Sequence, residues 1–315
     1  MYGELVCLCG GSLAVEPDVA LTCTRCGESY PIVERIPIML EQEYRRNDYD
    51  ELYGDTDFDQ NPFEYPLEYI EWRKAKINST IVEFLPLAAG QSVLDDGGGY
   101  GYLRHFLPSE TTYYNLDFSY EIIRFDRSSK RCVGRGERLP YRDDFFDNVV
   151  SGDVLEHVAD KVRYLNEAYR VLKPGGRFVV NTPRTGWVDS LRHSRLWWLP
   201  YLDSLCREPG KVVRKLGSRI FTADRQAGPA GPDPQTEAIQ DSSHEQRGHH
   251  PVVDIPSDPH WLEQTLTRIG FAILDRTYTD NRPGGFTNRF WRWFADRYIG
   301  EERHGHCILI ACEKS

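Results

Sequence analysis

The sequence predicts an α/β protein whose mostly parallel β-sheet has helices on both faces, preceded by a small β module. A glycine-rich turn follows a short apolar run at 93–101, and apolar runs then alternate with helical periodicity up to about residue 183. Four cysteines also cluster before residue 27. Alternating strands and helices are typical of parallel sheets with crossover helices, and clustered cysteines are typical of small metal-bound modules.

Length and charge limit the possible functions. The chain has 315 residues, enough for one large domain and a small one, and a formal net charge of −10, which disfavours broad electrostatic binding of nucleic acid. No apolar run is long enough to span a membrane. Residues Met1–Glu4 lack the basic region of a signal peptide. We therefore expect a cytoplasmic protein without a transmembrane segment.

The N-terminal cysteines form two pairs, each followed by glycine: Cys7, Cys9, Cys23 and Cys26. Thiolates on two such turns can converge on one tetrahedral zinc ion, which would stabilise a segment too short to fold alone. The Cys7–Cys9 spacing is one residue shorter than the usual Cys-x-x-Cys, so a ribbon that keeps its shape with reduced thiols is the alternative. Zinc is the favoured interpretation. Because four thiolates leave no open position, we expect a structural site.

The following residues extend this module. Together with the run Ser29–Leu40, residues 5–40 are similar to the small zinc-ribbon family that activates tRNA and release-factor methyltransferases. The resemblance implies a zinc-ribbon-like β module over 1–41. Residues 42–61 are acidic and polar and predict a linker, which leaves 62–315 for the large domain.

The large domain begins with apolar residues at helical spacing over 69–85, which predict a helix. The run Val93–Leu94 then ends in Asp95, and glycines follow at every second position: Gly97, Gly99 and Gly101. This pattern predicts a buried strand turning into a helix whose first amides stay unpaired and favour a negative group. Glycine allows positive φ and the close approach of a ligand.

A second acid, Asp117, ends a short predicted strand over 113–116, about 20 residues beyond Asp95, where nucleoside-binding α/β folds place an acid on the ribose hydroxyls. Phe118 is placed to cover the base. The alternative makes Asp117 the N-cap of a helix beginning near Ser119. Its pairing with the glycine loop favours the ribose role.

Three further motifs follow in order, at Glu137–Val150, Val154–Val158 and Glu167–Asn181. With them, residues 93–183 resemble the class I S-adenosylmethionine-dependent methyltransferases, in the branch that includes the quinone-biosynthesis enzymes. The resemblance implies a Rossmann-like sheet of seven strands, S-adenosylmethionine as the cofactor and methyl transfer as the activity.

In that family the glycine loop holds the methionine part of the cofactor, the acid after the second strand binds ribose, and the next residue lies against adenine. The resemblance therefore implies these cofactor-binding residues: Asp95, Gly97, Gly99, Gly101, Asp117, Phe118, Gly136, Glu137 and Asp153. Arg135 departs from the family, since many relatives carry an Asp there that contacts the adenine amino group. Either Gly136 and Glu137 replace that contact or adenine recognition is altered. Asp96 is a second departure, and adjacent carboxylates favour a shifted pKa.

His157 is the candidate catalytic base, because it follows the strand that ends near Asp153 and an imidazole titrates near neutral pH. The alternative is a helix-start residue that hydrogen-bonds the cofactor loop. Asp153, Glu156 and His157 also resemble the Mg²⁺ ligands of a quinone O-methyltransferase subgroup, where the metal would lower the pKa of an acceptor hydroxyl. That cation is the less favoured hypothesis, because Leu-Glu-His-Val recurs in relatives without a metal.

We predict transfer of a methyl group to O, N or C of a small-molecule or lipid-linked acceptor. The alternative is an RNA methyltransferase that uses the ribbon for recognition; the acidic charge and the lack of an Asn-Pro-Pro-Tyr-type motif disfavour it. A non-catalytic S-adenosylmethionine-binding scaffold, prompted by Arg135, is a weaker alternative.

The C-terminal part predicts a substrate-side insertion at about 184–250, a helix over 260–270 that ends at Gly270, and a final strand pair at 272–275 and 307–312. Aromatic residues recur every four positions over 286–298. Packing on the domain or on a twin subunit is the favoured interpretation of that face. A cover for a greasy substrate, or peripheral membrane contact, is the alternative.

Overall fold

The computed structural model describes residues 2–45, 50, 67–128, 130–185, 255–279 and 307–315. These residues belong to one compact unit. The expected aromatic helix over 286–298 and the expected insertion from residue 186 onward lie outside the described residues. None of the helices in the described part of the chain has the length and hydropathy needed to cross a bilayer.

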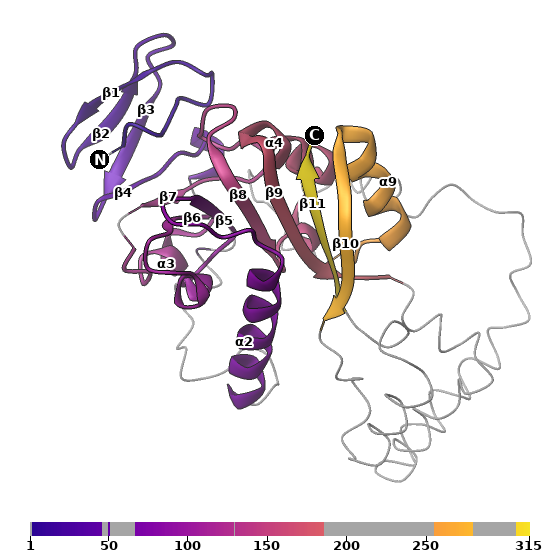
Figure 1. The fold of residues 1–315 in the computed structure, drawn as a ribbon. Helices are drawn as coiled ribbons and strands as arrows, with labels where there is room; N and C mark the ends of the chain where they lie inside the picture. Colours follow the sequence, from indigo (N-terminus) through magenta and orange to yellow (C-terminus); the bar gives the residue numbers. More distant parts are fainter. Residues whose placement is uncertain (1, 46–49, 51–66, 129, 186–254, 280–306) are drawn as a thin grey trace, which may run out of the picture. The chain divides into compact units, whose positions relative to one another are not determined.

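The large sheet has seven strands in the order β10-β11-β9-β8-β5-β6-β7 (Figure 1). Their bounds are β5 Ser92–Asp96, β6 Thr112–Asp117, β7 Arg131–Val133, β8 Phe146–Gly152, β9 Leu172–Pro183, β10 Phe271–Thr279 and β11 Cys307–Lys314. Only β11 runs against its neighbours; the other pairings are parallel. The predicted seven-stranded, mostly parallel sheet is confirmed.

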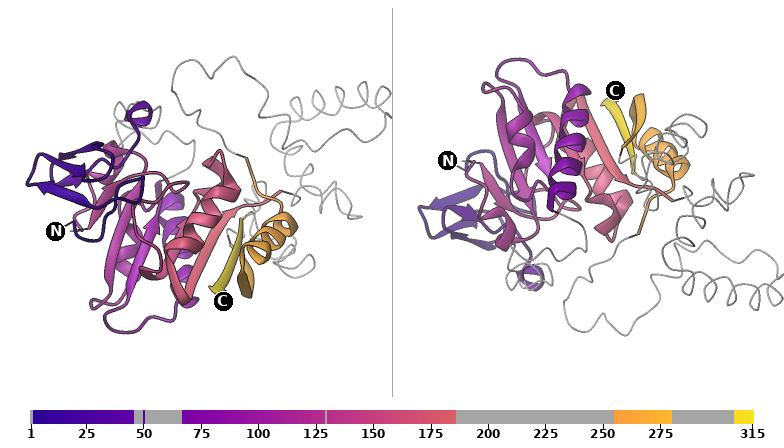
Figure 2. Two further views of the ribbon diagram at one scale, coloured as in Figure 1. Left: turned by 90° about the horizontal axis from the view of Figure 1, so that it is seen from above. Right: turned by 90° about the horizontal axis from the view of Figure 1, so that it is seen from below.

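Helices cover both faces of this sheet (Figure 2). Their bounds are α2 Leu67–Glu83, α3 Tyr120–Ile123, α4 Lys161–Val171 and α9 Pro259–Ile269. Ile77 and Ile81 of α2 share one core with Val150, whereas α4 and α9 share the other core with Val149. Neighbouring strand residues point to opposite faces, so the central strands are apolar on both sides and their sequences read as continuous apolar runs.

Side chains and glycines fix the ends of the helices. Asp160 accepts a hydrogen bond from the Arg163 amide at 2.9 Å at the start of α4, and Asp258 accepts one from the Trp261 amide at 2.7 Å at the start of α9. The helix α9 ends at Gly270, whose φ is 120°, as predicted.

The N-terminal module is a four-stranded antiparallel sheet in the order β1-β2-β3-β4. The bounds are β1 Leu13–Glu16, β2 Ala20–Cys23, β3 Ser29–Val33 and β4 Ile36–Pro37. Beyond β4, Ile38 pairs in parallel with Val133 of β7, and the Met39 amide donates to the Val133 carbonyl at 2.7 Å. The module therefore continues the large sheet past β7, a contact that the sequence did not predict.

Candidate functional site

The four N-terminal cysteines converge. Their sulfur atoms all lie within 4.8 Å of one another, and the Cys7–Cys26 and Cys9–Cys23 sulfur pairs are each 3.6 Å apart. A tetrahedral zinc ion with Zn–S bonds of about 2.3 Å separates its sulfurs by roughly 3.8 Å. The four residues therefore fit a zinc ion, and the short Cys7–Cys9 spacing does not keep them apart.

Glycines shape the two cysteine turns. Gly10 and Gly27 have φ of 77° and 76°, and the amides of Arg25 and Cys26 point at the Cys23 sulfur at 3.3 and 3.5 Å. Hydrogen bonds from the Cys26 and Arg25 amides lower the pKa of Cys23 to about 6, while burial raises the pKa of Cys7 to about 12. The backbone thus stabilises a thiolate at Cys23.

The glycine loop after β5 has positive φ at all three predicted positions, with 83° at Gly97, 52° at Gly99 and 74° at Gly101. The Gly97 amide donates to the Leu116 carbonyl at 2.8 Å, and the Gly99 amide donates to Asp117 Oδ2 at 2.9 Å. These loop amides are therefore paired with protein atoms. The segment that follows is a 3₁₀-helix, η2 (Tyr102–Phe106), instead of the predicted α-helix.

The packing of the protein itself requires glycine at several of these positions, whether or not a ligand binds there. A Cβ at Gly97 would collide with Val154 Cγ2, and one at Gly101 would lie 2.7 Å from the Asp126 carboxyl carbon. A Cβ at Gly136 would collide with the Tyr164 ring. Close backbone packing and positive φ therefore explain the glycines together.

Asp117 lies at the carboxyl end of β6. Its Oδ2 accepts from the Gly99 amide and its Oδ1 from the Ser119 amide, both at 2.9 Å. Burial raises the pKa of Asp117 to about 6. Each carboxylate oxygen retains capacity for a further donor. The N-cap of α3 is Ser119, so the capping alternative for Asp117 was wrong. Phe118 is half-buried beside it.

Two acids at the end of β5 are buried. Asp95 Oδ2 accepts from the Tyr113 hydroxyl at 2.7 Å, and burial raises the pKa of Asp95 to about 7. Burial also raises the pKa of Asp96 well above its ordinary value, and its Oδ2 has no hydrogen-bond partner among the described residues. Both carboxyls beside the glycine loop thus have raised pKa values, and burial, instead of their adjacency, is the main cause.

Asn115 and Asp126 support the loop, and the sequence interpretation missed them. Asn115 Nδ2 donates to the Gly99 carbonyl at 3.0 Å and to Asp126 Oδ2 at 2.8 Å. Asn115 is fully buried within β6. A polar residue inside an apolar strand was the available signal, because a buried amide needs partners.

Three further predicted site residues, Asp153, Glu156 and His157, lie near the carboxyl ends of β8 and β9. Asp153 has φ of 58°, and Asn181 of β9 donates to its Oδ1 at 2.9 Å. Glu156 is buried and accepts from the Thr182 hydroxyl at 3.0 Å, while His157 Nε2 lies 4.0 Å from Glu156 Oε1. Within the described residues, the cysteines are the one group of Cys, His, Asp and Glu that could share a metal ion. Asp153, Glu156 and His157 do not form such a group.

Glu137 and Gly136 lie beyond β7. Glu137 is buried, and its Oε1 lies 3.5 Å from the Arg135 guanidinium. Gly136 would place a Cβ 2.8 Å from Asp96 Oδ2. The segment Arg135–Glu137 therefore lies next to Asp96 at the end of β5.

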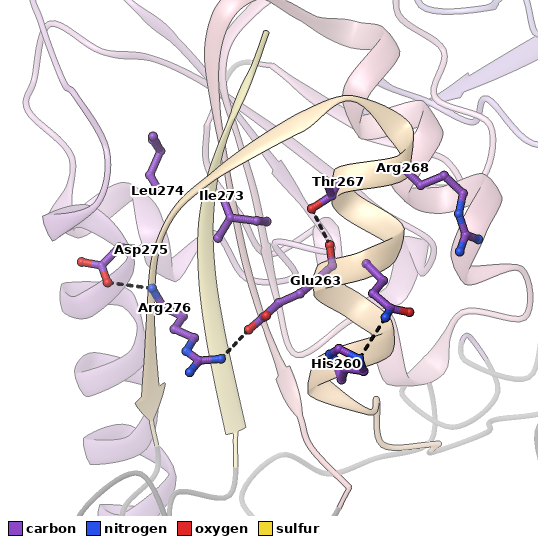
Figure 3. Close-up of a pocket in the computed structure, with 9 residues that line it drawn as sticks. His260, Glu263, Thr267, Arg268, Ile273, Leu274, Asp275 and Arg276 are labelled. Atoms are coloured by element: carbon purple, nitrogen blue, oxygen red, sulfur yellow. Dashed lines mark hydrogen bonds and ion pairs between the residues drawn. The ribbon is translucent and has the colours of Figure 1, made fainter.

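An open hollow of about 820 Å³ lies elsewhere, between α9 and β10 (Figure 3). Its lining includes the Arg276–Glu263 ion pair at 2.8 Å and the His260–Gln264 hydrogen bond at 2.9 Å. It belongs to the far edge of the sheet from β7, and none of the predicted site residues lines it. This hollow is therefore separate from the predicted site at the glycine loop.

Residues 94–180 match the family described as methyltransferase domain. This part of the chain is similar to methyltransferase domains. A probable S-adenosylmethionine-dependent methyltransferase of Mycolicibacterium smegmatis is 34% identical over 30% of this chain and 39% of its own length. A ubiquinone/menaquinone biosynthesis C-methyltransferase of Geotalea daltonii is 34% identical over 27% of this chain and 42% of its own length. The chain thus spans about two fifths of these relatives.

A solved complex between the Haloferax volcanii Trm112 methyltransferase activator and a methyltransferase is also similar. It is 18% identical, with a TM-score of 0.48, over 78% of this chain and 91% of that chain.

Proposed function

We propose that this protein is an S-adenosylmethionine-dependent methyltransferase that acts on O, N or C of a small-molecule or lipid-linked acceptor. The arrangement of Asp117 carries the proposal. Two backbone amides hold its partly buried carboxylate at the end of β6, directly beside the glycine loop. A carboxylate held in this way can accept both hydroxyls of a ribose.

The residues at the ends of β5, β6 and β8 fit the cofactor. The three positive-φ glycines leave the loop backbone without side chains, and Phe118 offers a ring next to the acid. The bound cofactor supplies an activated methyl group on a sulfonium. The contribution of the protein is then to orient the acceptor and to remove its proton.

His157 is our proposed base. It follows β8 on the 3₁₀-helix η3 (Leu155–His157), and its side chain is 35% exposed, so a substrate can reach the ring. The carboxylate of Glu156, 4.0 Å from Nε2, would stabilise the imidazolium formed when the ring takes a proton. The Thr182 hydroxyl holds that carboxylate in place.

We also propose that the cysteine cluster binds structural zinc. Its sulfurs are spaced as a tetrahedral site requires, and four thiolates leave no position for a substrate.

Calorimetric titration with S-adenosylmethionine tests the cofactor. We expect 1:1 binding by the wild type and a loss of at least about tenfold in Asp117→Ala, because the ribose would lose a charged acceptor. Asp275→Ala, which removes an exposed carboxylate on β10, is the matched control. Absence of binding by the wild type would refute the proposal.

The acceptor class is tested with methyl-labelled S-adenosylmethionine and three fractions of host cells: an organic extract, aqueous small molecules and RNA. We expect label in one of the first two fractions, and its loss in His157→Ala with cofactor affinity unchanged. Label in the RNA fraction would contradict the proposed acceptor class.

A further inference from the structure

The N-terminal module reaches the predicted nucleoside site through residues 38–45, named here the ribbon tail. The Met39 amide donates to the Val133 carbonyl at 2.7 Å, which aligns the tail along β7. Ile38 and Leu40 are buried with Ile123 and Val133, and Tyr44 and Phe118 pack against this cluster. The tail therefore ends at the carboxyl ends of β6 and β7, where Asp117 and Phe118 lie.

Tyr44, in the 3₁₀-helix η1 (Gln42–Tyr44), contacts both sides of this region. Its ring meets Phe118 edge to face, with centroids 6.4 Å apart, and the Arg135 guanidinium lies over it at 4.0 Å. Asp50, farther along the chain, accepts from the Ser119 hydroxyl at 2.7 Å. Through these contacts, the segment that follows the ribbon packs against Phe118 and Arg135, which flank the predicted position of the adenine base.

Arg135 retains donor capacity at this place. Its side chain is 14% exposed and pairs with Glu137 at 3.5 Å, and its buried Nε has no hydrogen-bond partner within the described residues. A guanidinium only donates hydrogen bonds. The 6-amino group of adenine is a donor, whereas N1, N3 and N7 of its ring are acceptors; of these, N3 and N7 stay acceptors when an oxo group replaces the amino group. A carboxylate at this place would read the amino group; a guanidinium can read only the ring nitrogens.

We propose that Arg135, held over Tyr44 and paired with Glu137, recognises the base of the bound cofactor as a donor to N3 or N7 of its ring. The inference rests on the proposed function. Tyr44 is a positioning residue, so the ribbon tail is part of the nucleoside site. The structure thereby accounts for the basic residue where the family resemblance predicts an acid.

The test compares S-adenosylhomocysteine with S-inosylhomocysteine, which has an oxo group in place of the 6-amino group and keeps N3 and N7. Donor recognition predicts that the wild type binds the two by calorimetry within about threefold, because no buried protein acceptor is left unpaired. Arg135→Asp should introduce a preference of about tenfold for the adenosyl compound, since a buried carboxylate rewards the amino group. Arg135→Gln, which keeps an amide donor, should leave the two affinities similar.

Tyr44 is tested by the same ratio. Tyr44→Ala should weaken both compounds about tenfold, because the guanidinium loses the ring beneath it, whereas Tyr44→Phe should stay within about twofold. Tyr2→Ala removes a ring of the same module whose hydroxyl donates to the Arg35 carbonyl, and serves as the control for loss of module stability.

The outcomes separate the two proposals. A wild type that binds neither compound refutes the proposed function. A wild type that binds both, but prefers the adenosyl compound more than tenfold with Arg135→Asp unchanged, overturns this inference and leaves the function intact. Equal binding by Tyr44→Ala and the wild type overturns the role of the ribbon tail.

Discussion

Two regions of this protein gather acidic side chains, and they do so in opposite ways. In the N-terminal module four thiols lie within 4.8 Å of one another. Around the glycine loop, the carboxyls of Asp95, Asp96 and Asp117 each lie in a separate environment: the first accepts from Tyr113, the second is buried near Tyr164 and the third accepts from two amides. Thiolates that converge on one point suit a single cation. Carboxylates that lie apart suit a ligand with several hydroxyl and amino groups.

Glycine is used differently in the same two regions. A Cβ at Gly27, in the second cysteine turn, would meet nothing within 4 Å, whereas one at Gly97 would collide with Val154. Both residues have positive φ, of 76° and 83°. Backbone conformation alone requires glycine at Gly27, whereas at Gly97 close packing requires it too. The proposed zinc ion would hold the ribbon together, whereas close packing holds the loop.

The largest difference between the two regions should appear when the proposed zinc ion is removed. Structural zinc contributes on the order of 10 kcal/mol to the folding of small modules, so chelation should unfold the ribbon. Because the Met39 amide pairs with Val133, its hydrogen exchange should rise sharply, and Cys23→Ser should behave alike. Cys132→Ala, a buried cysteine outside the cluster, should keep the zinc content of the wild type. If the Met39 amide stayed protected from hydrogen exchange in metal-free protein, the proposed role of zinc in folding the ribbon would be contradicted.

The second prediction concerns the glycines. Gly97→Ala should lower the free energy of unfolding by about 3 kcal/mol, since strain and a collision combine, and Gly27→Ala by about 1 kcal/mol, since only φ is strained. Denaturant titrations of both variants, with zinc present, provide the measurement. Equal losses would show that packing at Val154 relaxes.

The third prediction uses the buried acid of β5. Burial raises the pKa of Asp95 to about 7, so the folded state holds a proton that the unfolded chain releases near pH 4. Its contribution is therefore fully present below about pH 4 and is lost as pH rises through about 7. The stability of the wild type relative to Asp95→Asn should fall across this window, by on the order of 4 kcal/mol. A difference that does not change between pH 4 and 8 would refute the raised pKa.

The smallest effect is expected at the ribose acid. Ionised Asp117 accepts hydroxyl donors better than its protonated form, and its pKa is raised to about 6. The affinity of the wild type for S-adenosylhomocysteine should rise about threefold to tenfold as pH increases from 5 to 7. Asp117→Asn should bind more weakly and lose this rise. An unchanged pH profile in Asp117→Asn would assign the titration to another group.

Local patterns carried most of the successful predictions. Apolar runs that end in Asp95 and Asp117 located β5 and β6, and Gly270 located the end of α9. Paired cysteines with glycines located a cluster that does converge. Each of these features is encoded within a few residues, because strand burial and turn conformation are local properties.

Long-range pairing could not be predicted in the same way. The contact between Met39 and Val133 joins two backbones, and backbone hydrogen bonds leave no trace in residue type. The pairing of the loop amides was not predictable either, because the end of β6 supplies their acceptors, the Leu116 carbonyl and the Asp117 carboxylate. The role of Asn115 likewise depends on Asp126, which a separate segment supplies.

The pairing of Ile38 with Val133 has a consequence for solubility. A terminal strand such as β7 would otherwise present a row of free amides and carbonyls, which other copies of the chain can use as a template for aggregation. The ribbon tail occupies that row and continues into an antiparallel module. A methyltransferase domain expressed without its first 61 residues would thus lose the segment that shields it from self-association.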